Sequence, residues 1–233
     1  MPLSAVQIAP LTVKMVTPLH VGAGYRRGLI HRTLVRDGCG HVYLPASSLK
    51  GKVRTACEAL LAASGLPPCC APYPQQMPAC RLNGCLICRV FGAPGQGPEL
   101  FWHDAHLAGW PEHASTCGQT SVRTQVQLDR ARGIAAEAHL YTGEATAPNL
   151  VFRSEQGVTG RLKLTPILGD SDLSYELILL LAGLKLVRTL GGEVSRGMGH
   201  CEIELPTHVD VDDRPLLVND LLAQVELLTF WPE

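Results

Sequence analysis

The chain has 233 residues, of which 46% are hydrophobic and 18% charged, and its formal net charge is −1. This apolar content is enough for a sizeable core in one elaborated domain or two small ones. The near-neutral charge excludes a general polyanion binder, so a nucleic-acid surface must come from local clusters of arginine and lysine. Apolar runs are too short to span a membrane, and the first residues lack the pattern of a signal peptide. We therefore expect a cytoplasmic protein with no membrane partner.

Periodicity predicts short strands that alternate with helices along the chain. The predicted strands are 11–19, 33–36, 41–44, 122–128, 135–141, 150–152, 161–167 and 200–205. The predicted helices are one that begins at Ser47 or Ser48, one at 173–190 and an amphipathic one at 216–230. This order is compatible with a split β-α-β-β-α-β arrangement that carries insertions. The fold class is therefore expected to be α+β, with a ferredoxin-like (RNA-recognition-motif-like) core, a common platform for RNA.

A glycine-rich loop near the end of the chain is the first candidate binding site. Gly191, Gly192, Gly197 and Gly199 fall within nine residues, and Arg196 lies among them. Exposed N–H groups of such a loop can form a concave anion site, and an arginine beside it offers a fork of donors to phosphate. The alternative is an ordinary helix end followed by a turn into a strand.

The start of the first helix is a second candidate site for phosphate. Ser48 can cap it, and Lys50, Lys52 and Arg54 follow. A capped helix start with basic residues favours anions. The alternative is a solvated basic face.

Basic and acidic residues elsewhere point to RNA contacts or to chemistry. In the segment Tyr25–Arg32, His31 stands among Arg26, Arg27 and Arg32 and could act as a general acid or base on RNA. The alternative is a histidine that only contacts phosphate or solvent. A further polar cluster comprises Arg123, Asp129, Arg130 and Arg132. Three carboxylates could in principle hold Mg²⁺, although sequence spacing brings no two together: Asp37, Asp104 and Asp129.

Cysteines in a loop rich in proline and glycine predict a structural zinc site. Cys85 and Cys88 form a C-x-x-C pair, and Cys80 and Cys70 precede it, with Cys69 possible in place of Cys70. Four thiolates at this spacing suit tetrahedral Zn²⁺, which would supply the folding energy that the loop lacks. A redox C-x-x-C is the competing interpretation, but it needs a helix start, whereas the preceding Asn-Gly indicates a turn.

Taken together, these stretches resemble the RAMP superfamily of CRISPR proteins, and more closely the repeating backbone subunit of type III effector complexes. The residues that carry the resemblance are LHVGAG at Leu19–Gly24, YLPASSLKGKVRTACE at Tyr43–Glu58, CLICRVFG at Cys85–Gly92, WHDA at Trp102–Ala105, VQLDRARGIA at Val126–Ala135 and LGGEVSRGMGHCEIE at Leu190–Glu204. Each motif is modest alone, but the ordered set covers most of residues 11–205.

The resemblance implies a single domain over residues 1–233 with three additions. These are a cysteine-rich zinc loop at 65–98, a β-hairpin "thumb" region at 106–150 and a C-terminal helix within 206–233. It also implies assembly along a CRISPR guide RNA, pairing with target RNA, other RAMP subunits as partners and a role in antiviral defence. By the same resemblance, the residues against the guide backbone are Ser48, Lys50, Lys52, Arg54, Gly191, Gly192, Arg196 and Gly197.

One departure from the family pattern concerns catalysis. Active members carry an aspartate in the loop after the first glycine turn, and it cuts target RNA with a metal ion. That position falls at about His31, and no aspartate lies between Gly24 and Arg36. We therefore expect no Mg²⁺-dependent cut of target RNA from this loop. The alternative is an endoribonuclease that processes precursor guide RNA through His31 or cuts target RNA through another acidic residue.

Overall fold

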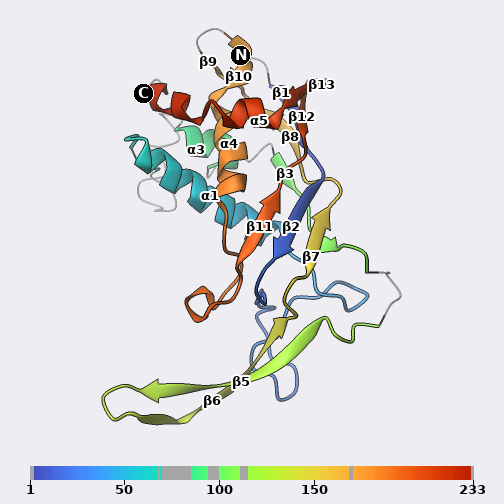
Figure 1. Ribbon diagram of the computed structural model, residues 1–233, viewed down its shortest axis with the longest axis vertical. Helices are drawn as coiled ribbons and strands as arrows, with labels where there is room; N and C mark the ends of the chain where they lie inside the picture. Colours follow the sequence, from blue (N-terminus) through green and yellow to red (C-terminus); the bar gives the residue numbers. More distant parts are fainter. Residues whose placement is uncertain are drawn as a thin grey trace.

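The computed structural model describes residues 3–67, 69, 85–93, 100–110, 115–167 and 170–231. At its centre, four strands form two long antiparallel lines, each made of two strands that follow one another in the chain (Figure 1). We call each of them a strand line. One line is β1 (Ser4–Ile8) followed by β2 (Leu11–Met15), and the other is β7 (Val151–Ser154) followed by β8 (Val158–Leu162). β1 pairs with β8, and β2 pairs with β7. The two lines therefore stay together over their whole length.

Further strands extend this pair on both sides. The flanking strands are β3 (Leu100–Trp102), β4 (His106–Leu107), β11 (Cys201–Glu204), β12 (His208–Val211) and β13 (Arg214–Leu217). In the described part of the chain, the strand order is β11-β2-β7-β4 at one end and β13-β12-β1-β8-β3 at the other. With a helix after β2 and another after β8, this is the order of a split β-α-β-β-α-β arrangement. The expected α+β class with antiparallel sheets is confirmed.

Helices pack beside the sheet, and the core lies between them and the strands (Figure 1). α1 (Ala46–Ala63) fully buries one stripe, namely Leu49, Val53, Cys57 and Leu61, and its other residues are half-buried or exposed. α4 (Tyr175–Leu186) is buried on all sides from its first residue to Leu184. A Cβ built on Gly183 would lie 2.2 Å from the Cys57 Sγ, so the glycine permits the two helices to touch. α3 (Leu86–Phe91) packs on both.

A two-stranded hairpin projects from the lower end of the molecule (Figure 1). It consists of β5 (Thr120–Asp129) and β6 (Ile134–Thr146). The Asp129 carboxylate accepts the N–H groups of Ala131 and Arg132 at 3.0 and 3.2 Å and so closes the turn. Two predicted strands and the polar turn between them thus form one hairpin. β6 is longer than the predicted strand 135–141, because it begins at Ile134 and continues to Thr146.

Several predicted boundaries were wrong. The expected C-terminal helix at 216–230 is divided among β13, α5 (Val218–Leu222) and the 3-10 turn η2 (Val225–Phe230). Asp212 and Asp213 both adopt a left-handed conformation, which makes a tight β12–β13 turn and takes Leu216 and Leu217 into a strand. α4 begins at Tyr175, after β10 (Asp170–Ser174), and ends before Val187, which is extended.

Other predicted strands are shorter or divided. The segment 161–167 is split between β8 and β9 (Pro166–Ile167), and the latter pairs with β10. Segments 33–36 and 41–44 make only isolated bridges, such as Arg36 to Val42. β1 was missed, because its five residues show no clean alternation before the Ala9-Pro10 step. Among the described residues, no helix is long and apolar enough to cross a membrane.

Candidate functional site

An open cleft of about 480 Å³ lies between the start of α1 and the glycine loop. It is lined by Ser48 and Lys52 of α1 and by Gly191 and Gly192 of the loop. Two sites that were predicted separately, the basic helix start and the glycine loop, are therefore one surface. Serine hydroxyls and a lysine ammonium are donors that proteins use to hold phosphate, whereas the Gly192 N–H already donates within the protein.

His20 also lines this cleft, and sequence reasoning did not single it out. Its Nδ1 lies 2.6 Å from the Glu144 carbonyl oxygen on β6. Its own carbonyl accepts the Gly192 N–H at 2.8 Å. A Cβ on Gly191 would lie 2.4 Å from that same carbonyl, and Gly191 has a φ of +71°, so only glycine fits there. The glycine loop therefore packs on the backbone of His20 and fixes it.

Lys50 and Arg54 lie on a different side of α1 from the cleft. Arg54 donates to the Glu58 carboxylate at 3.0 Å and to the Cys69 Sγ at 3.6 Å. Burial, followed by the charge of Arg54, holds the pKa of Lys50 below its ordinary value. The phosphate site predicted at the start of this helix is thus divided. Ser48 and Lys52 lie at the cleft, and Arg54 lies beside the cysteines.

Glu193 joins the glycine loop to two other segments, and sequence reasoning missed it as well. Its carboxylate pairs at 2.6 Å with Arg32 of the segment Tyr25–Arg32, which we call the basic loop, and at 3.1 Å with Arg196. It also accepts a hydrogen bond from the Gln125 amide of β5 at 2.9 Å. Arg196 also donates to the Gln125 oxygen at 3.0 Å. Burial raises the pKa of Glu193, but hydrogen bonds from Gln125 and Arg32 and the nearby positive charges outweigh it and lower that pKa. We call these four residues the Glu193 hub.

The base of the hairpin is fixed by a second carboxylate. Glu144 on β6 pairs with Arg36 and accepts the Leu34 N–H at 3.1 Å. Burial raises the pKa of Glu144, and these hydrogen bonds lower it to below its ordinary value. Glu144 therefore ties the hairpin to the segment that follows the basic loop, and the Glu193 hub ties it to the basic loop itself.

His31 lies on the exposed edge of the basic loop, against β6. The His31 Nδ1 lies 3.1 Å from both the backbone N and the hydroxyl oxygen of Thr142. Arg32 stacks on the Tyr141 ring, with 5.0 Å between the guanidinium carbon and the ring centre. The other predicted RNA-binding arginines are exposed, on the basic loop and the hairpin: Arg26, Arg27, Arg123 and Arg130.

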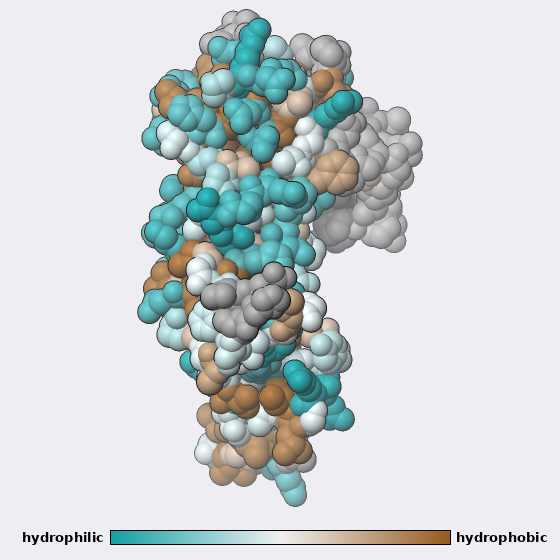
Figure 2. All heavy atoms as spheres, turned by 90° about the vertical axis from the view of Figure 1, so that its right-hand side faces the viewer, coloured by the Kyte–Doolittle hydropathy of each residue, from teal (hydrophilic) through white to brown (hydrophobic). Residues whose placement is uncertain are grey.

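The hairpin also exposes apolar side chains. Figure 2 shows brown residues gathered at the lower end of the molecule, the end that the hairpin occupies in Figure 1. Exposed large apolar residues of β5 and β6 are Val122, Val126, Leu128, Ile134 and Leu140. An exposed apolar patch of this kind marks a surface that contacts something else.

The three carboxylates considered for Mg²⁺ serve the local structure. Asp37 accepts the N–H groups of Cys39 and His41 at 3.0 and 2.9 Å, and Asp104 accepts the Ala46 N–H at 2.7 Å. Asp129 closes the hairpin turn. Among the described residues, they form no metal-binding group. A larger cleft of about 680 Å³ lies beside Arg153. The positive charge of Arg153 is paired with the Glu155 carboxylate at 2.7 Å, so this cleft is the weaker candidate for binding phosphate.

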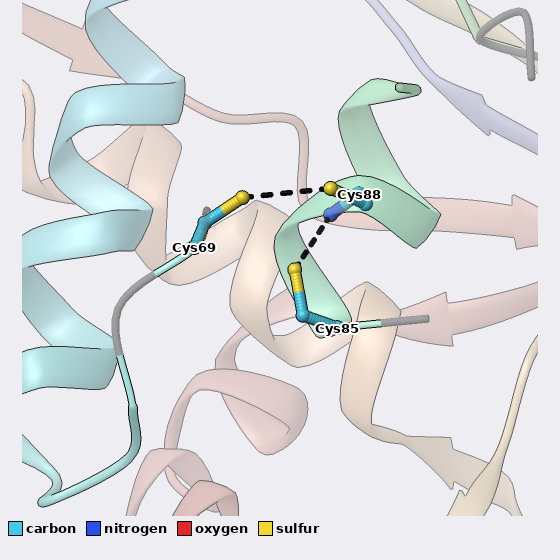
Figure 3. A group of neighbouring side chains, drawn as sticks. All are labelled: Cys69, Cys85 and Cys88. Atoms are coloured by element: carbon cyan, nitrogen blue, oxygen red, sulfur yellow. Dashed lines mark hydrogen bonds between the residues drawn. The ribbon is translucent and has the colours of Figure 1, made fainter. Parts of the chain in front are cut away.

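Three cysteines converge beside α1 and α3 (Figure 3). The sulfur atoms of Cys69, Cys85 and Cys88 all lie within 4.8 Å of one another, and Cys69 and Cys88 are 3.4 Å apart. The group can hold a metal ion, and a set of thiolates is compatible with zinc. Cys69 is the one placed here, whereas Cys70 and Cys80 lie outside the described residues. Cys85 caps α3, so the C-x-x-C pair does open a short helix, contrary to the turn-based argument against a redox pair.

Comparison with known proteins identifies one family. The family model for the RAMP superfamily matches residues 12–202. No curated protein matches the chain. The matched range begins in β2 and ends in β11, so it includes α1, the hairpin and the glycine loop.

Proposed function

Because the chain belongs to the RAMP superfamily of CRISPR-associated RNA-binding proteins, we propose that it is a backbone subunit of a type III-like effector ribonucleoprotein. It would bind guide RNA in a filament with other RAMP subunits and pair the guide with target RNA. The observation that carries this proposal is the cleft in which Ser48, Lys52 and the glycine loop meet. Such donors bind any phosphate backbone, which suits a subunit that must accept guides of any sequence.

The projecting hairpin supports the same proposal. We take β5–β6 as the thumb that the family resemblance implied. Arg123 and Arg130 are exposed on it together with the apolar residues described above. A surface that mixes positive charge with apolar side chains suits contacts to nucleic acid and to a neighbouring subunit.

The cysteine group supports a structural zinc ion, the second part of the proposal. Cys69, Cys85 and Cys88 would supply three ligands, and Cys70 or Cys80 would complete the set. Bound zinc would tie Cys69, after α1, to α3 and so contribute folding energy at this point. Arg54, which touches Cys69, would offset part of the thiolate charge.

A metal-independent endoribonuclease is the second candidate, and the His31 geometry favours it. His31 is exposed beside Arg32, so its neutral ring could take the proton of the RNA 2′-hydroxyl and its protonated ring could give a proton to the leaving oxygen. This reaction needs the RNA 2′-hydroxyl as its nucleophile. It would be added to guide binding and would not replace it.

Binding of labelled single-stranded RNA to the purified chain tests the main proposal. Lys52→Ala should weaken binding about tenfold for any base sequence, since a hydrogen bond to a charged group is worth roughly 1.5 to 3 kcal/mol. Affinity should also fall as salt rises, with a shallower slope in the variant. Lys163→Ala is the matched control, because Lys163 follows β8 beside Ser4, at the end of the strand line away from His20. Equal affinities for Lys52→Ala and Lys163→Ala would contradict the proposal.

A further inference from the structure

The surroundings of His20 determine which of its ring nitrogens carries a proton. A carbonyl oxygen can only accept, so the Nδ1 that lies 2.6 Å from the Glu144 carbonyl must carry a proton. In the neutral imidazole the second nitrogen, Nε2, then has a lone pair and no proton. His20 therefore offers the cleft an acceptor, whereas Lys52 offers only donors.

The Nε2 atom lies on the cleft side of the ring. A Cβ built on Gly22 would be 3.4 Å from Nε2, and Gly22 lines the same cleft. No hydrogen bond from the described residues to Nε2 accompanies the one at Nδ1. The ring is also fixed in place, because β6 holds its Nδ1 and the glycine loop holds its backbone carbonyl. A fixed acceptor beside a phosphate site selects a ligand that has a donor near a phosphate.

The backbone of RNA has one such donor. Phosphate oxygens and the ring oxygen of the sugar only accept hydrogen bonds, whereas the 2′-hydroxyl can donate. DNA lacks this group. We propose that the His20 Nε2 accepts a hydrogen bond from a ribose 2′-hydroxyl of the bound strand and so makes the cleft select RNA over DNA. The inference rests on the proposed RNA-binding function and adds the group that distinguishes the two nucleic acids.

Fluorescence anisotropy with the full chain tests this, using one sequence as RNA, as DNA and as 2′-fluoro RNA. The 2′-fluoro strand retains the sugar pucker of RNA but has no 2′ donor. The chain should bind RNA about fivefold more tightly than either other strand, the value of one hydrogen bond. Tight binding of the 2′-fluoro strand, equal to that of RNA, would overturn the inference, because sugar shape alone would then explain the preference.

His20→Asn is the informative variant, since its amide can still donate to the Glu144 carbonyl while the Nε2 acceptor is lost. RNA affinity should fall about fivefold to the level of DNA, and DNA affinity should not change. Unchanged DNA binding also serves as evidence that the variant is folded. Lys52→Gln is the matched control, and it should weaken RNA and DNA equally and leave the preference intact.

The outcomes separate this inference from the proposed function. If RNA and DNA bind equally well to the unaltered chain, or if His20→Asn retains the preference for RNA, the 2′-hydroxyl contact is wrong while nucleic-acid binding stands. If neither strand binds, both proposals fail. A preference that disappears only in His20→Asn supports both.

Discussion

At the scale of single residues, His31 determines which cleavage chemistry is open to the basic loop. An imidazole is a poor Mg²⁺ ligand, and Mg²⁺ is held by oxygen groups. A neutral imidazole can instead take the proton of the 2′-hydroxyl, and a protonated one can give a proton to the leaving oxygen. Any cut made by this loop should therefore proceed without a metal ion, with His31 as a general acid or base.

Incubation with labelled precursor and target RNA, with and without EDTA, checks this prediction. We expect no Mg²⁺-dependent cut from the loop. A cut that persists in EDTA should be lost, by about a hundredfold or more in rate, in His31→Ala and in a substrate with a 2′-deoxy sugar at the cut site. Cleavage that survives His31→Ala but stops with EDTA would contradict the prediction and return attention to Asp37, Asp104 or Asp129.

The residues of the cleft were only partly predictable. Ser48, Lys52 and the glycines belong to local patterns, so sequence alone could mark them. The importance of His20 depends on a carbonyl 124 positions away, and that of Glu193 depends on arginine and glutamine side chains from other segments. The sequence did offer one weak signal for Glu193, because it follows Gly191 and Gly192, and Gly191 packs closely on the His20 carbonyl. Local patterns do not report partners at such separations.

At the scale of elements, the Glu193 hub holds the hairpin against the glycine loop. Glu193→Gln removes the charge that attracts Arg32 and Arg196, so amide hydrogen exchange across β5 and β6 should speed up about fivefold, the effect of roughly 1 kcal/mol. Glu155→Gln, at a glutamate paired with Arg153 on the surface, is the control and should leave the hairpin unchanged. Identical exchange in both variants would show that packing alone orients the hairpin.

Lowering the pH should loosen the hairpin in the same way as Glu193→Gln. Burial raises the pKa of Glu193, but its hydrogen bonds and the nearby arginines lower that pKa by more. The pKa therefore lies below the ordinary value of 4.5. Its contribution is therefore complete above pH 4.5 and is lost as the pH falls through the lowered value. Hairpin protection should decline in this acid range in the unaltered chain, and Glu193→Gln should show a smaller decline.

The elements themselves were predicted best where their pattern is local. α1, the hairpin strands and their turn follow from an apolar stripe, from alternation and from Asp129. The prediction of a C-terminal helix was wrong because a tight turn at Asp212 and Asp213 pairs the residues that follow with β12, despite their amphipathic pattern. The sequence also did not predict that Lys52 of α1 faces the cleft while Arg54 faces the cysteines, because this depends on which segments pack around the helix.

At the scale of the whole molecule, the cysteine group connects the segment after α1 to the helical layer. Arg89 of α3 pairs with the fully buried Glu176 of α4 at 2.7 Å, so the cysteines are linked to the core through that ion pair. Cys85→Ser should abolish stoichiometric zinc and lower the melting temperature, because bound metal contributes directly to folding. Cys117→Ser, at an exposed cysteine outside the group, should retain both.

Elemental analysis of reduced protein and thermal unfolding measure these outcomes. Cys70→Ser and Cys80→Ser, compared side by side, would identify the remaining ligand. Absence of zinc from unoxidised, unaltered protein would rule out the metal site.

The buried state of α4 has a thermodynamic consequence for the loop that follows it. The helix is surrounded by core on all sides, and Leu190, just before the first glycine of the loop, is fully buried as well. The glycine loop therefore begins from a fixed anchor, and its conformational entropy is lost when the chain folds rather than when a ligand arrives. A ligand that binds at this cleft should then lose little of its binding free energy to ordering the protein.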